Sequence, residues 1–121
     1  MSKHILVIED QNDLRDVLRT LLTGSGYAVS EAADGRDGVE KAKSGRPDLI
    51  LMDIQLPLMD GYEATRQIKA HPNLKATPII AISSFAMKGD EEKARAAGCD
   101  AYVAKPYSAR KLLETINRYL T

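Results

Sequence analysis

The feature that most constrains the fold is a regular alternation between short apolar runs and longer segments with apolar residues at helical spacing. Uninterrupted apolar runs occupy residues 5–8, 49–52 and 79–82. Such runs are typical of parallel strands that are buried on both faces. After the first run, a leucine-rich stripe over 14–22 repeats at i, i+3, i+4, i+7 and i+8, which predicts an amphipathic helix. The pattern therefore predicts strands and helices in strict alternation along the chain.

Five such β–α units can be traced along the sequence. Weaker, shorter strands are expected at 28–32 and 101–104, and helices at about 12–23, 35–43, 61–70, 89–97 and 108–120. Strict alternation predicts a parallel sheet covered by helices on both faces with right-handed crossovers. Placing the two weaker strands at the edges gives the order 2-1-3-4-5. The predicted fold is a flavodoxin-like α/β three-layer sandwich, (βα)5.

Composition limits the functions that such a domain can have. The 121 residues fit one domain spanning 1–121, and 17 Lys and Arg balance 17 Asp and Glu. A net charge of zero argues against nucleic-acid binding and against an anionic membrane surface. The apolar runs are far shorter than the ~20 residues that span a bilayer, and no signal peptide precedes the first strand. A single cysteine, Cys99, excludes an internal disulfide and a zinc site built on cysteine pairs. We expect a cytoplasmic protein.

Polar side chains follow the central strands at the points where those strands end. Glu9 and Asp10 follow the first strand and Asp53 follows the third. These two strands are neighbours in the predicted order, about 4.8 Å apart, so the carboxylates should face one another. Carboxylates this close repel unless a cation neutralises them, and oxygen ligands without His or Cys suit Mg²⁺ or Mn²⁺. Hydroxyls and a cation at the same edge (Ser83, Ser84 and Lys105) would complete a site for phosphate oxygens.

A simpler interpretation has to be weighed against this one. Polar residues commonly follow buried strands because loops are exposed to water, so any one of these residues alone is weak evidence. Acids on both central strands together with a hydroxyl and a lysine, all at one edge, favour a Mg²⁺–phosphoryl site.

Four segments in this order resemble a response-regulator receiver domain across essentially the whole chain. They are ILVIED at 5–10, DLILMDIQLPLMDG at 48–61, PIIAISSFAM at 78–87 and GCDAYVAKP at 98–106. The resemblance is strongest to single-domain receivers of phosphorelays and to receiver modules of hybrid sensor kinases. It implies that Asp53 accepts a phosphoryl group from the phosphohistidine of a histidine kinase or histidine phosphotransfer protein.

The resemblance also implies roles for the surrounding residues. Mg²⁺, with Mn²⁺ as a substitute, would be held by Glu9, Asp10, Asp53 and the backbone carbonyl of Gln55. Lys105 would pair with the phosphoryl oxygens, Ser83 would be the switch hydroxyl beside the small Ser84, and Tyr102 would turn inward after phosphorylation. Gln11, Leu14 and Val17 match positions that contact the phosphodonor protein.

Two departures and three alternatives qualify these expectations. Ser83 stands where Thr is common, and Gln55 and Phe85 supply no carboxylate to position water, so slow autodephosphorylation is expected. The main interpretation is that the protein is a signalling receiver and not a conventional enzyme. It would pass its signal to a downstream protein or act through a homodimer. The alternatives are a degenerate receiver that works without phosphorylation and a hydrolase using the same Mg²⁺ site. Dinucleotide binding is weaker, since no G-x-G-x-x-G follows the first strand.

Overall fold

The computed structural model describes residues 2–83, 89–104 and 107–120. Strands and helices alternate along the chain as the apolar pattern predicts. The elements are β1 His4–Ile8, α1 Asn12–Gly24, β2 Ala28–Ala32, α2 Gly35–Gly45, β3 Leu49–Asp53, α3 Gly61–Ala70, a 3₁₀ turn Pro72–Leu74, β4 Ile79–Ser83, α4 Asp90–Ala97, β5 Ala101–Ala104 and α5 Ala109–Leu120.

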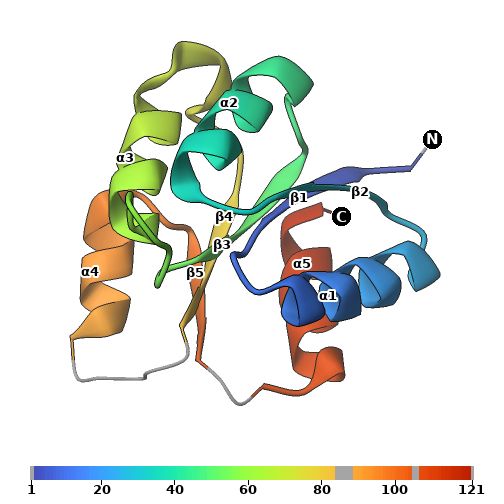
Figure 1. Cartoon of the computed structure of the whole chain (residues 1–121). Helices are drawn as coiled ribbons and strands as arrows, with labels where there is room; N and C mark the ends of the chain where they lie inside the picture. Colours follow the sequence, from blue (N-terminus) through green and yellow to red (C-terminus); the bar gives the residue numbers. More distant parts are fainter. Residues whose placement is uncertain (1, 84–88, 105–106, 121) are drawn as a thin grey trace.

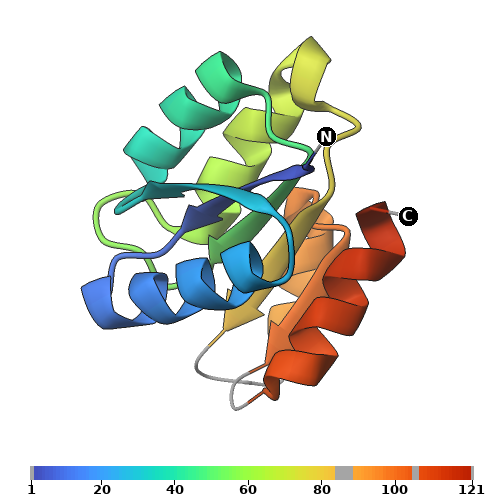
Figure 2. The ribbon, with the colours of Figure 1, turned by 90° about the vertical axis from the view of Figure 1, so that its right-hand side faces the viewer.

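The strands form one parallel sheet in the order β2-β1-β3-β4-β5, which confirms the predicted topology. Figure 1 shows α2, α3 and α4 on one side of this sheet and α1 and α5 on the other. Figure 2 shows the three layers from the side, with the twisted sheet between the helices. The fold is the predicted flavodoxin-like sandwich.

The uninterrupted apolar runs are explained by the two cores that the sheet separates. In β1, Ile5 and Val7 pack with α1 and α5, whereas Leu6 and Ile8 pack with α2, α3 and α4. Successive side chains of a strand point to opposite faces, so a strand covered on both sides needs apolar residues throughout. The edge strand β2 is only partly buried, which is why its sequence is weaker.

Side-chain caps set the helix boundaries that the sequence indicated. The carboxylates of Asp34 and Asp60 accept from the backbone N–H groups three residues on, at 2.8 and 2.9 Å, and Ser108 Oγ accepts from Lys111 N at 3.0 Å. Helix α2 runs two residues further than expected, to Gly45, before Arg46 adopts a left-handed conformation. The 3₁₀ turn after α3 was not predicted. No helix in the described ranges is both long and apolar enough to cross a bilayer.

Candidate functional site

Three carboxylates meet at the carboxyl edge of the sheet. Glu9 and Asp10 follow β1, and Asp53 is the last residue of β3, the neighbouring strand. One oxygen of each carboxylate lies within 4.8 Å of the others. Glu9 and Asp53 are buried and Asp10 is exposed, so the cluster is open to solvent on one side. The sequence predicted this convergence, and the structure confirms it.

Backbone N–H groups hold two of the carboxylates in place. Gln55 N donates to Asp53 Oδ1 at 3.0 Å, and Gln11 N donates to Glu9 Oε2 at 3.1 Å. Each bond spans two residues, so the loops directly after β1 and β3 fold back on the acid that precedes them. The carboxylates are therefore oriented by the backbone before any ligand arrives.

Burial and the proximity of the three carboxylates make full ionisation of the cluster unfavourable without a cation. The pKa of Glu9 is raised to about 8, first by burial and then by its hydrogen bond to and repulsion from Asp53, against the lowering effect of the Gln11 N–H. Tyr107, half-buried at the start of the segment leading to α5, has a raised pKa because of burial and the charges of Glu9 and Asp53. A divalent cation between the carboxylates would remove this repulsion. Three carboxylate oxygens without nitrogen or sulfur ligands fit a hard ion such as Mg²⁺.

The other residues expected around the acidic cluster are placed to different degrees. Ser83, which is buried, ends β4 one residue beyond Ile82, the register partner of Asp53. Gln55 is exposed two residues after Asp53, and the predicted use of its carbonyl as a metal ligand stays a prediction. Ser84 and Lys105 lie outside the described residues.

Tyr102 lies on β5 with its ring against the core on the α3 and α4 side of the sheet. Its hydroxyl is buried and has no hydrogen-bond partner in the described part of the chain. An unpartnered buried hydroxyl is costly, so this orientation leaves a polar group able to gain a bond on rearrangement. The expected movement of the ring stays a prediction.

The three residues expected to contact a phosphodonor protein differ in exposure. Gln11 is exposed, Val17 is 61% exposed, and Leu14 is half-buried against the core shared with α5. The sequence did not single out Leu58, which is fully exposed in the loop between β3 and α3. Large apolar side chains exposed singly are common on protein surfaces, so the contact role expected of Val17 stays a prediction.

The sequence did not predict a role for Arg15, which forms hydrogen bonds with the backbone of the loop that carries Glu9 and Asp10. Its Nη1 donates to the carbonyl oxygens of Glu9 at 2.8 Å and Asp10 at 3.4 Å, and its Nε lies 3.6 Å from Glu31 on β2. The spacing of an arginine one turn into a helix gives no signal of such backbone contacts.

A parallel α/β sandwich with an acidic cluster beyond its central strands defines a protein that can hold a hard cation at the edge of its sheet. Residues 5–117 match the response regulator receiver domain, and the chain belongs to that family.

Relatives and solved structures agree with this assignment over nearly the whole chain. The polar-differentiation response regulator DivK of Brucella anthropi is 43% identical over 99% of this chain and 98% of its own length. The receiver domain of a sensor histidine kinase from Pseudomonas aeruginosa PAO1, with a magnesium ion coordinated in its active site cleft, is 39% identical with a TM-score of 0.92, covering 99% and 98% of the two chains. The chemotaxis protein CheY4 of Vibrio cholerae is 28% identical with a TM-score of 0.93, covering 98% and 99%. The chain is a receiver domain of the two-component signalling family.

Proposed function

We propose that residues 1–121 form one receiver domain that accepts a phosphoryl group on Asp53 in a Mg²⁺-dependent reaction. The observation that carries the proposal is the meeting of Glu9, Asp10 and Asp53 within 4.8 Å at the ends of two neighbouring strands. The carboxylates would hold Mg²⁺, with the Gln55 carbonyl as a further ligand. When bound, the ion would offset the cluster's negative charge and give phosphoryl oxygens a counter-charge.

The reaction is a transfer between two proteins. A carboxylate oxygen of Asp53 attacks the phosphorus of a phosphohistidine, the P–N bond breaks, and the imidazole leaves and takes up a proton. The hydrogen bond from Gln55 N to Asp53 Oδ1 fixes the carboxyl group, so that its other oxygen is the nucleophile. Lys105 and the hydroxyls of Ser83 and Ser84 would then bind the phosphoryl oxygens. Without a carboxylate to position water, autodephosphorylation is slow.

Phosphorylation would signal through the segment that leads from β4 to β5. The phosphoryl group carries about two negative charges and strong acceptor oxygens, which would draw Ser83 toward it. Tyr102 would follow into the space that this opens, shifting a pre-existing equilibrium between two conformations. A downstream protein or a second copy of the chain would read the changed surface.

The surface that meets the phosphodonor is proposed on α1. Val17 is 61% exposed and, with Asp16, Thr20 and Leu21, lines a shallow pocket of about 420 Å³. An apolar patch on a helix beside the acidic cluster suits a helix of a histidine kinase or histidine phosphotransfer protein. Such partners would place the chain in the cytoplasm.

Incubation with acetyl phosphate, with and without Mg²⁺, tests the proposal. We expect an added phosphoryl mass on the wild type only when Mg²⁺ is present, and none on Asp53→Asn. Asp13→Asn is a matched control, because Asp13 is an exposed acid on α1 outside the cluster, and it should be labelled like the wild type. A folded wild type that takes no label would favour a scaffold that works without phosphorylation. Labelling that survives Asp53→Asn would place the acceptor elsewhere.

A further inference from the structure

A second site lies away from the acidic cluster, along the free edge of the sheet. A pocket of about 550 Å³ opens between α4, β5 and α5, and within the described ranges β5 pairs only with β4. The pocket is lined by Arg95, Ala101, Tyr102, Val103, Ser108, Arg110, Lys111, Glu114, Thr115, Arg118 and Tyr119. Its volume falls in the range of ~300–1,000 Å³ that small-molecule sites occupy.

The lining is strongly basic, although the chain as a whole is neutral. Among the described residues of the lining, four side chains are Lys or Arg and one, Glu114, is acidic. Arg110 forms an ion pair with Glu114 at 3.1 Å. Lys111 and Arg118 have no ion pair among the described residues. They lie about two turns apart on α5 and therefore on the same face of the helix. Two cations that form no ion pair in the described part of the chain thus face one pocket, with Glu114 between them on the helix.

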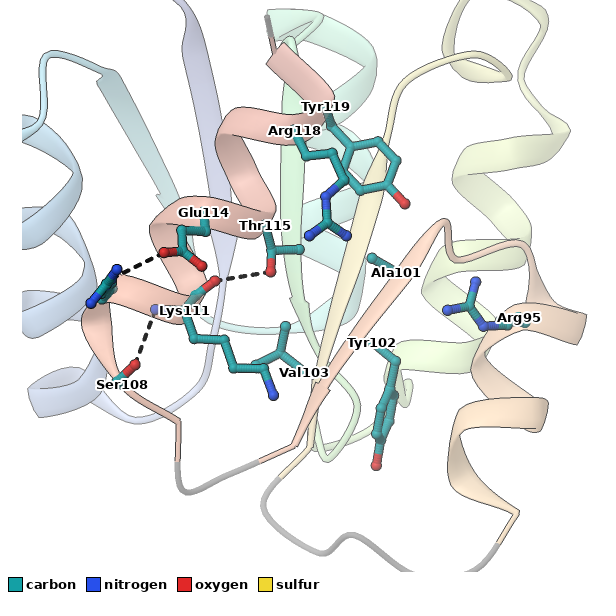
Figure 3. Close-up of a pocket in the computed structure, with 11 residues that line it drawn as sticks. Arg95, Ala101, Tyr102, Val103, Ser108, Lys111, Glu114, Thr115, Arg118 and Tyr119 are labelled. Atoms are coloured by element: carbon teal, nitrogen blue, oxygen red, sulfur yellow. Dashed lines mark hydrogen bonds and ion pairs between the residues drawn. The ribbon is translucent and has the colours of Figure 1, made fainter.

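Arg95 contributes from the opposite wall. Figure 3 shows Lys111 and Arg118 reaching from α5 toward β5, with Arg95 on α4 across the strand. The Nη1 of Arg95 donates to the carbonyl of Asp100 at 3.2 Å, and its guanidinium also pairs with Glu91 at 3.1 Å. These bonds hold the planar group in one orientation. It can therefore serve as a flat surface for a ring, while its charge is already offset.

The remaining lining suits an organic group next to an anion. Ala101 and Val103 are buried side chains of β5 beneath the pocket. The ring of Tyr119 is fixed by a hydrogen bond from its hydroxyl to the carbonyl of Asp100, 2.9 Å long. The buried side chains beneath the pocket, the fixed ring of Tyr119 and the fixed guanidinium of Arg95 together favour a ligand with a flat, partly apolar group. Lys111 and Arg118 favour phosphate oxygens.

We propose that this pocket binds a nucleoside phosphate, with Lys111 and Arg118 on the phosphate and the base against Arg95 and Tyr119. A protein occupant, including a second copy of the chain, would have to present acidic side chains to Lys111 and Arg118, and a glutamate-rich peptide would detect such an occupant. A nucleic acid fits less well, because the positive charge is confined to one pocket of a neutral chain. The proposal does not rest on phosphoryl acceptance by Asp53, although the pocket includes Tyr102, the residue proposed to move on phosphorylation.

The test is a titration of ¹⁵N-labelled protein with AMP, GMP, ATP and GTP, beside adenosine and inorganic phosphate as reference probes. EDTA keeps the acidic cluster free of Mg²⁺, so that nucleotide anions are repelled there. We expect saturable amide shifts confined to residues 95, 101–103 and 108–119 for at least one nucleotide, and much weaker binding of adenosine and of phosphate. Lys111→Ala and Arg118→Ala should each weaken binding at least about tenfold, the cost of one charge-assisted hydrogen bond.

Lys93→Ala is the matched control. Lys93 is an exposed cation on α4 about 200° around the helix from Arg95 and does not line the pocket. Its loss should leave the affinity unchanged. No shifts at 10 mM nucleotide, shifts that persist in both α5 variants, or equal binding of inorganic phosphate would each overturn the proposal. Shifts of the same residues by a glutamate-rich peptide but by no nucleotide would also overturn it, in favour of a protein partner.

Discussion

Arg15 links the acidic pair to the rest of the fold through its guanidinium group. Its bonds to the carbonyls of Glu9 and Asp10 hold the loop from which both carboxylates project, and its side chain is only 17% exposed. Groups that orient metal ligands commonly affect metal affinity by tenfold or more. We therefore expect Arg15→Ala to weaken Mg²⁺ binding roughly tenfold, measured by isothermal titration calorimetry.

Two variants separate positioning by Arg15 from its charge. Arg15→Lys keeps the charge but loses the planar fork, so positioning predicts weaker Mg²⁺ binding in this variant too. If only charge mattered, Arg15→Ala would strengthen Mg²⁺ binding by removing a nearby cation and Arg15→Lys would leave it unchanged. Arg19→Ala is the control, because Arg19 pairs with the same Glu31 at 3.0 Å without a bond to either carbonyl. Its Mg²⁺ affinity should match the wild type.

At the level of the elements, helix α3 packs directly against the end of β3. A Cβ on Gly61 would lie 2.5 Å from the carbonyl oxygen of Asp53 and 2.6 Å from the Cα of Ile54. Both neighbours are backbone atoms, so the helix or the strand end would have to move. We expect Gly61→Ala to lower the free energy of unfolding by about 1–3 kcal/mol in urea denaturation. In Gly24→Ala, the control at the end of α1, the new Cβ meets nothing within 4 Å, and stability should rise by up to ~1 kcal/mol. Equal stability of the Gly61 variant and the wild type would contradict this packing.

The same elements show how far the sequence determines the molecule. Apolar runs and caps such as Asp60 are local signals, so the order of strands and the convergence of Glu9 with Asp53 could be predicted. The end of α2 could not, since it depends on Arg46 adopting a positive φ of 45°. In the sequence, Arg15 and Lys111 are indistinguishable from other charged residues of amphipathic helices. The contacts of Arg15 with backbone carbonyls, and the pocket that Lys111 lines, are formed only when the chain packs.

For the whole molecule, the buried carboxylates make stability depend on pH and on Mg²⁺. The pKa of Glu9 is raised from 4.5 to about 8, mainly by burial and by Asp53. Between these values the folded protein retains a proton that the unfolded chain has released. The unfolded state then binds fewer protons, so the free energy of unfolding falls as the pH rises from about 4.5 to 8. This loss reflects the unfavourable ionisation of Glu9, which is buried and lies beside Asp53.

Mg²⁺ should reverse the trend, because the ion and the Glu9 proton compete for the same carboxylates. In EDTA we expect the thermal midpoint to fall between pH 5 and 8, measured by circular dichroism. Saturating Mg²⁺ should raise the midpoint little at pH 5 and most near pH 8, since binding no longer has to displace the proton there. Glu9→Gln cannot gain the charge, so its midpoint in EDTA should fall much less over this range than that of the wild type. A wild-type midpoint that is flat or rises with pH in EDTA would show that Glu9 is already ionised in the folded protein. The repulsion within the cluster would then not be what Mg²⁺ relieves.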